Sequence, residues 1–395
     1  MIAGVSTVVT ITAVDTSGIT VTTYAGAKTL IFSGADISPN GSAPTAVDSS
    51  TAKDVFGANT VLTFTKGVAT SSVSLYTAET ASVNVTDGTI ASGANGLSVV
   101  VSPANASSLG VAGSTIISDG QSNALTITAF DPYGNTATGY TGNKSLIFSG
   151  ASVSPNNNAP TATDNTGTSI PFGGSTAVSF SSGVGISTAT LYTVETANIN
   201  VTDGTISATS LPVTVLPSPA TYLAVTGNSS MTSGSSNQLT ITAYDSWGNT
   251  AKGYSGVIPL IFSGATPPGN GNVPTATDYT NTNIPFGNNT SLNFNGGVGS
   301  STVVLYTPET AIINVTDGAI NANGHTLNIA VTVLPKANLV LIPQQVTQAI
   351  QAGSISEQLI GLQDNYLSDQ AVINLRSNSP VDLITATGAD ASLSI

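Results

Sequence analysis

A long internal repeat constrains this chain more than any other feature of its sequence. The phrases TITAVD, TITAFD and TITAYD end at Asp15, Asp131 and Asp245. Four further phrases, which begin LIFSGA, PTA, YT and NVTDG, recur with the same spacing, stepping by 116 residues and then by 114. Because five landmarks share one period, we expect tandem copies of one domain rather than a short-period solenoid.

Within each copy, apolar residues alternate with polar ones. In ALTITAF, the residues Leu125, Ile127 and Ala129 fall on one face of an extended strand, and threonines fall on the other. This alternation is typical of an antiparallel sheet with one buried face. The Asp203-Gly204 pair in VTDGTI is a strong hairpin signal. The pattern predicts an all-β fold of two-sheet antiparallel sandwiches.

Short segments that contain proline join the copies: VSPANASS, VLPSPATY and VLPKANL. Such linkers are stiff, so we expect the sandwiches to form an elongated rod. The repeat boundaries predict domains over 1–103, 104–217 and 218–336, followed by a partial fourth sandwich over 337–395.

The first and last copies are predicted to be incomplete. When the first copy is aligned with the second, Met1 falls at Ile117, so the strand that LGVAG supplies from Leu109 is missing. A half-sandwich exposes an apolar face and an open edge. Either adjoining sequence of a longer array completes it, or subunits donate strands head to tail and form a filament. A small C-terminal domain over 337–395 that folds alone is the third alternative.

Composition excludes several function classes. The chain has a net charge of −13 with only seven Lys and Arg residues, which argues against a nucleic-acid partner and an anionic membrane surface. No apolar run is long enough for a membrane helix, so we expect no membrane insertion. Cysteine is absent, which leaves no thiolate chemistry. The single histidine, His325, has no repeated acid or serine motif beside it, and we expect no enzyme activity.

The loops DPYGN and DSWGN hold the candidate metal ligands. They place Asp131 with Asn135, and Asp245 with Asn249, and calcium binds carboxylate and amide oxygens of this kind. The alternative, which the sequence favours, is a turn in which the Asp accepts backbone N–H groups. Calcium is the one cofactor considered.

Two other kinds of candidate site follow from the copies. Glycosylation sequons stand at Asn84, Asn200, Asn314, Asn143 and Asn228, and the alternation predicts that the asparagines of the three NVT sequons, Asn84, Asn200 and Asn314, face outward. Tyr133 and Trp247 occupy equivalent loop positions and are candidate interface aromatics, either between domains or subunits or toward a sugar. Packing over their own sandwich is the alternative, and it is the one that the sequence favours.

The segments LTITAFDPYGNTATGYTGNKSLIFSGA and TAVSFSSGVGISTATLYTVETANINVTDG resemble the bacterial Ig-like repeats of large prokaryotic surface proteins, the invasin- and intimin-type group. The first copy departs from the pattern, with Ile19 in place of Asn135. The resemblance implies Ig-like sandwiches in an extracellular stalk or fibre on a prokaryotic cell surface.

We therefore expect a structural subunit or segment of a cell-surface filament that contacts copies of itself or adjoining segments end to end, with strand complementation as one means. An adhesin stalk that binds surface glycans or a host surface, perhaps with calcium, is the alternative. A surface-layer component is the third.

Overall fold

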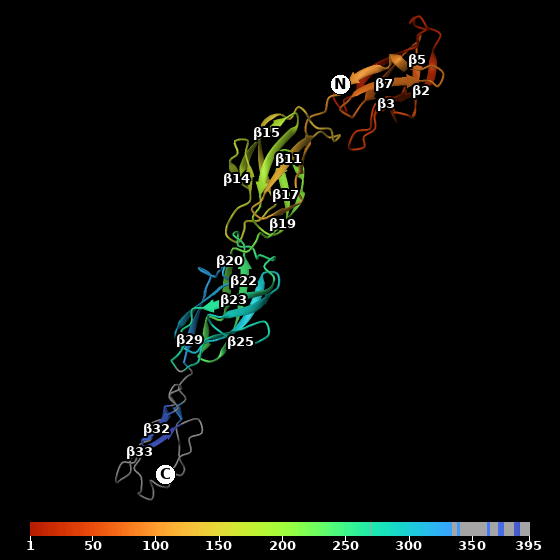
Figure 1. The fold of residues 1–395 in the computed structure, drawn as a ribbon. Helices are drawn as coiled ribbons and strands as arrows, with labels where there is room; N and C mark the ends of the chain where they lie inside the picture. The colour runs from red at the N-terminus through yellow and green to blue at the C-terminus, as the bar shows by residue number, and fades with distance from the viewer. Residues whose placement is uncertain (270, 334–337, 340–361, 364–369, 375–382, 388–395) are drawn as a thin grey trace, which may run out of the picture. The chain divides into compact units, whose positions relative to one another are not determined.

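The computed structural model describes residues 1–269, 271–333, 338–339, 362–363, 370–374 and 383–387 (Figure 1). Strands dominate the described part, which contains one 3-10 turn, η1 (Gly93–Asn95), and no α-helix. The predicted all-β class is confirmed. The chain divides into two compact units, Met1–Pro217 with Trp247–Asn249, and Ser218–Ser246 with Thr250–Ile395. In the described residues, no helix is long and apolar enough to cross a membrane.

The first copy is a sandwich of two four-stranded sheets, in the orders β1-β6-β3-β4 and β5-β2-β7-β8. Its strands are β1 (Thr7–Thr12), β2 (Gly26–Ser33), β3 (Thr45–Val47), β4 (Lys53–Val55), β5 (Asn59–Phe64), β6 (Val68–Ser74), β7 (Thr80–Thr86) and β8 (Leu97–Val100).

The second copy repeats this plan and adds strands at its start. Antiparallel pairing between β15 and β16 joins its two layers into one continuous path. Its strands are β9 (Ser108–Ala112), β10 (Ile116–Ser118), β11 (Ser122–Phe130), β12 (Gly142–Ser149), β13 (Thr161–Thr163), β14 (Ser169–Pro171), β15 (Ser175–Ser181), β16 (Val184–Thr190), β17 (Thr196–Thr202), β18 (Ala208–Thr209) and β19 (Leu211–Leu216).

The third copy has two five-stranded sheets, in the orders β20-β22-β27-β24-β25 and β21-β29-β28-β23-β26. Its strands are β20 (Tyr222–Gly227), β21 (Ser230–Thr232), β22 (Ser236–Tyr244), β23 (Gly256–Ser263), β24 (Thr275–Thr277), β25 (Asn283–Pro285), β26 (Asn289–Phe294), β27 (Val298–Val304), β28 (Thr310–Thr316) and β29 (Leu327–Thr332).

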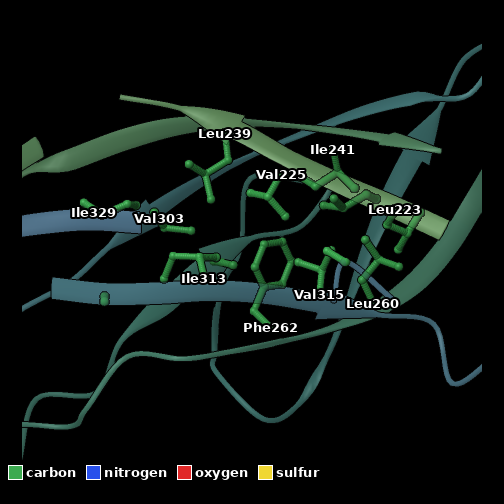
Figure 2. Packing of buried hydrophobic residues seen from close by; sticks show 14 of the residues in the cluster. Leu223, Val225, Leu239, Ile241, Leu260, Phe262, Val303, Ile313, Val315 and Ile329 are labelled. Carbon is green, nitrogen blue, oxygen red and sulfur yellow. The ribbon is translucent and has the colours of Figure 1, made fainter. Parts of the chain in front are cut away.

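Each copy has its own hydrophobic core between its two sheets. In the third copy, Leu239 and Ile241 of β22 face Phe262 and Ile313 of the opposite sheet, and all four are at most 1% exposed (Figure 2). The burial of β22 alternates along the strand, as the period-two pattern predicts. Hydrophobic burial of this kind is the main stabilising term in a chain with few charges.

A tyrosine ties the loop after the TITA strand to the Asp-Gly hairpin in every copy. In the first copy, the Tyr24 hydroxyl donates to Asp87 Oδ2 at 2.7 Å. Burial, and then this hydrogen bond, raise the pKa of Tyr24 to about 12. Backbone N–H of Ile90, followed by the Tyr24 hydroxyl, holds the pKa of Asp87 below its usual range. The equivalent pairs are Tyr140 with Asp203 and Tyr254 with Asp317.

The three core clusters fall within the predicted ranges 1–103, 104–217 and 218–336, although the exact boundaries stay a prediction. The prediction of a partial sandwich over 337–395 falls mostly outside the described residues. Within that range, β30 (Asn338–Leu339) pairs with β31 (Leu362–Gln363), and β32 (Gln370–Asn374) pairs with β33 (Leu383–Thr387).

Candidate functional site

The DPYGN loop of the second copy folds as a tight turn around its aspartate. Asp131 Oδ1 accepts the backbone N–H groups of Tyr133 and Asn135 at 2.8 and 2.9 Å. Gly134 adopts a φ of +81°, which favours glycine. Asp15 forms the same turn in the first copy, accepting from Ser17 and Ile19. The turn is thus a common element of the copies.

Asn135, the last residue of this turn, forms hydrogen bonds with the first copy. Its Nδ2 donates to the Tyr76 carbonyl at 2.8 Å, and its Oδ1 accepts the backbone N–H of Ala78 at 2.8 Å. Nδ2 also donates to Asp131 Oδ2 at 2.9 Å. Asn135 is only 6% exposed, so these bonds are shielded from water. One amide therefore satisfies a backbone donor and a backbone acceptor of the neighbouring sandwich.

Tyr133 packs against the first copy. Its ring lies 4.9 Å from the Tyr76 ring, between centroids, at an angle of 59°. Gly4 lies directly against it, because a Cβ built at Gly4 would be 1.8 Å from the Tyr133 hydroxyl oxygen. The Tyr133 carbonyl accepts the backbone N–H of Asn40 at 3.1 Å. Tyr133 therefore packs against the neighbouring copy, and not only over its own sandwich as the sequence favoured.

We call this contact between the first two copies the Asn135 joint. It consists of Asp131, Tyr133 and Asn135 of the second copy and Tyr76 and Ala78 of the first. The linker also takes part in it. The backbone N–H of Ala104, in the linker, donates to Asp131 Oδ2 at 2.9 Å. Asn40 Nδ2 donates to the Pro132 carbonyl at 2.7 Å. The buried Asp131 carboxylate thus joins the linker to the loop whose Asn135 contacts the first copy.

The asparagine and aromatic contacts recur within the first unit, which includes Trp247–Asn249, although Asn249 Nδ2 also donates to Asp119 Oδ2 at 2.8 Å. Asn249 Nδ2 donates to the Tyr192 carbonyl at 2.8 Å, and Asn249 Oδ1 accepts the N–H of Val194 at 3.1 Å. The rings of Trp247 and Tyr192 lie 4.5 Å apart. Trp247, like Tyr133, therefore makes an aromatic contact with the loop that begins YT.

Sequence analysis identified Asn135 and Asn249 as candidate metal ligands. It did not identify the residues to which they are hydrogen-bonded. The partners are backbone atoms of Ala78 and Val194, in the loops YTAET and YTVET, and a backbone atom has no sequence signature. One signal was present: YTPET in the third copy has Pro308 at this position, which has no N–H to donate.

Calcium at Asp131, Asn135, Asp245 and Asn249 stays a prediction. At Asp131, both carboxylate oxygens accept N–H groups, whereas a calcium ion requires free oxygen ligands. Asp245 is fully buried. Within the described ranges, no group of three His, Asp or Glu side chains is placed to hold a metal ion. The geometry favours the turn over the ion.

The glycosylation candidates lie on strands or strand ends and differ in exposure. Asn143, Asn200 and Asn228 are exposed, whereas Asn84 and Asn314 are half-buried. Asn314 Nδ2, the atom a glycan would modify, donates to Asn323 Oδ1 at 2.7 Å, and Asn84 Nδ2 donates to the Ser82 carbonyl. Asn200 Nδ2 donates to the Asn198 carbonyl at 3.0 Å, so Asn143 and Asn228 are the more accessible acceptors. Modification itself stays a prediction.

His325 has a packing role in the third copy. Its ring stacks on Tyr222, with centroids 4.3 Å apart, and its carbonyl accepts the N–H of Val225 at 3.0 Å. The absence of enzyme activity stays a prediction.

The fold defines a class, tandem antiparallel β-sandwiches. A scan of known protein families finds no matching family model, and no curated protein matches the sequence. Among solved structures, invasin, a bacterial integrin-binding protein, matches at 12% identity over 95% of this chain and 64% of its own, with a TM-score of 0.32.

The Yersinia pseudotuberculosis adhesin InvE matches at 18% identity over 58% of this chain and 60% of its own, with a TM-score of 0.24. Domains 5–6 of the S-layer protein SbsC match at 16% identity over 58% and 99%, with a TM-score of 0.20. This chain spans less than two thirds of the invasin and InvE structures. The specific assignment to invasin- and intimin-type repeats stays a prediction.

Proposed function

We propose that this chain is a structural segment of an extracellular cell-surface filament or stalk, built from sandwiches that meet end to end. The observation that carries the proposal is the Asn135 joint. A flexible linker needs no dedicated residues, yet here Tyr133 and Asn135 contact the first copy and Asp131 binds the backbone of the linker. Residues that recur in the repeats and hold neighbouring domains together would limit bending between the domains. Such limited bending suits a spacer that has to resist mechanical force.

Energetics support a stiff joint. Removing the Asn135 amide would leave the Tyr76 carbonyl and the Ala78 N–H without their partners, and an unsatisfied buried group costs about 1–3 kcal/mol. A domain that rotates about the linker breaks these bonds and exposes their groups to water, at a net cost of about 0.5–1.5 kcal/mol per hydrogen bond. The function assigned is mechanical, with no catalytic step.

The test is electron microscopy of the native cell surface with antibody raised against the purified chain. Label along uniform, long fibres is expected. Label only inside cells would refute the proposal. Label on isolated rods with a distinct tip would favour the adhesin alternative, and a planar lattice would favour a surface-layer component.

Spin-label distances test the joint itself. Since the chain has no cysteine, one introduced cysteine in each of the first two copies gives a clean label pair. We expect a narrow distance distribution that broadens in Asn135→Ala. A broad distribution in the unaltered chain would contradict a stiff joint.

A further inference from the structure

The loop that contains Asn40 contacts the second copy beside the Asn135 joint. The Asn40 backbone N–H donates to the Tyr133 carbonyl at 3.1 Å, and Asn40 Nδ2 donates to the Pro132 carbonyl at 2.7 Å. Asn40 Oδ1 accepts a hydrogen bond within its own loop, from Ser42 Oγ at 2.8 Å. Both polar atoms of this side chain are therefore engaged while the joint is closed.

Glycine follows Asn40 in the sequence, and an Asn-Gly pair is chemically labile. A backbone nitrogen can attack the side-chain carbonyl carbon of the asparagine before it, and a glycine nitrogen is the least hindered because it carries no side chain. Asn40 is exposed, so water reaches it. In the closed joint, however, the Gly41 N–H donates to the Ser38 carbonyl at 2.8 Å. The closed joint therefore restrains both the attacking nitrogen and the amide that it would attack.

The second copy has the same backbone contact without the glycine. The Asn156 N–H donates to the Trp247 carbonyl at 3.2 Å, as Asn40 does in the first joint. The next residue is Asn157, with a φ of +62°, where Gly41 has +89°. Asparagine tolerates this conformation, so the loop does not require glycine here. The Asn157 side chain hinders attack, and the two contacts therefore differ in chemical lability.

We propose that Asn40 is a deamidation site, that the closed joint protects it, and that its conversion holds the joint open. The Gly41 nitrogen loses its proton to water and bonds to Asn40 Cγ, and the side-chain nitrogen leaves as ammonia. Water then opens the resulting succinimide at either carbonyl and leaves aspartate or isoaspartate. The net reaction consumes one amide and one water and yields one carboxylate and one ammonium ion.

The product no longer fits the closed joint. Aspartate has an oxygen in place of Nδ2, and a carboxylate has no hydrogen to donate to the Pro132 carbonyl. Two oxygens would face each other across the distance that a hydrogen bond spans in the unaltered chain. Isoaspartate also adds one carbon to the backbone of the loop. The proposal rests on the proposed function only in that the joint is taken to hold neighbouring repeats together.

Timed incubation of the full chain at mildly alkaline pH tests the protection. Peptide mapping by mass spectrometry measures the conversion of each Asn-Gly pair. Asn135→Ala weakens the joint and should speed conversion at Asn40 about tenfold, because a locally opening site reacts in proportion to its open population. The Asn-Gly pairs at Asn95 and Asn323 lie outside the joint, so they should convert at the same rate in both chains.

Two loop variants test the consequence for the joint. Asn40→Asp has one of the two products from the start, and it should broaden the spin-label distances across the joint. Gly41→Asn reproduces the second copy, and a Cβ at Gly41 would meet nothing within 4 Å. This variant should keep the narrow distances and slow conversion at Asn40.

Equal conversion of Asn40 in the unaltered chain and in Asn135→Ala, or no conversion in either, overturns the proposal. So does a narrow distance distribution in Asn40→Asp. A joint that is stiff in the unaltered chain and insensitive to Asn40 would still support the spacer function, so failure of this proposal is distinguishable from failure of that one.

Discussion

Asp54 occupies a position that carries isoleucine in the other copies, namely Ile170 and Ile284. It lies in β4, and its Oδ2 is buried with no hydrogen-bond partner in the described residues. A buried carboxylate oxygen without a partner is destabilising, because folding removes its hydrogen bonds to water and no protein hydrogen bond replaces them. The first copy therefore has a half-buried carboxylate where its neighbours have an apolar side chain.

Asp54→Ile should stabilise the first copy by about 1–2 kcal/mol, since it removes the unsatisfied oxygen and adds apolar burial. Hydrogen exchange at equilibrium, read on the first copy alone, measures the change. The reverse substitution, Ile170→Asp, should destabilise the second copy by a similar amount. A neutral or harmful Asp54→Ile would mean that the carboxylate has an unseen role.

The Tyr24–Asp87 pair makes the first copy sensitive to pH at both extremes. The folded pKa of Tyr24, about 12, lies above its usual value, so the stabilisation is complete below about pH 10 and is lost as pH rises toward 12. Asp87 has a lowered pKa, so its stabilisation is present above about pH 4 and is lost as pH falls through the folded pKa.

Tyr24→Phe should remove the alkaline loss in the first copy and lower its stability at neutral pH. Denaturation followed from pH 7 to 12 by segment-resolved exchange or proteolysis is the measurement. Tyr279→Phe is the control, because Tyr279 is 55% exposed. An unchanged alkaline transition in Tyr24→Phe would show that another group governs it.

Among structural elements, the DPYGN turn has two functions that its residues divide between them. Asp131 and Gly134 make the turn, and the first copy keeps the corresponding Asp15 and Gly18. Asn135 makes the contact with the neighbour, and Ile19 replaces it in the first copy. The turn is thus required by each sandwich, whereas the asparagine serves the joint.

Gly4→Ala should loosen the Asn135 joint, because the new Cβ would overlap the Tyr133 hydroxyl. Gly18→Ala is a matched control: Gly4 and Gly18 have φ values of +74° and +80°, but a Cβ at Gly18 meets nothing within 4 Å. Both should therefore show similar backbone strain. Only Gly4→Ala should broaden the spin-label distances across the joint, and equal broadening in both variants would count against the Tyr133 contact.

At the scale of the whole molecule, stability rests on sheet hydrogen bonds and apolar burial, because only seven residues carry positive charge. Exposed ion pairs would add little in any case. The stability of the three copies should therefore respond to salt in the same way. We expect the melting temperature to depend only weakly on salt concentration.

Removing divalent cations should leave the melting temperature unchanged, since Asp131 accepts N–H groups on both oxygens. Calorimetry with and without a chelator is the measurement. A melting temperature that falls with the chelator and recovers with calcium would restore the calcium prediction.

Local pattern determined most of the fold from sequence alone. The alternation of Leu125, Ile127 and Ala129 gave a strand with one buried face, and Asp203-Gly204 gave a hairpin, because both depend on neighbours within a few residues. Because the same phrases recur in each copy, a strand or turn that was predicted in one copy could also be predicted in the others. The loop residues Asp131, Asn135 and Tyr133 were also found, because they recur.

Only the tertiary structure decided what those loop residues contact. Asn135 binds Tyr76 and Ala78 through their backbone atoms, and Tyr24 meets Asp87 across 63 residues. Periodicity fixes which face of a strand is apolar, but the partner of a face or an edge is set by chain segments far away in sequence.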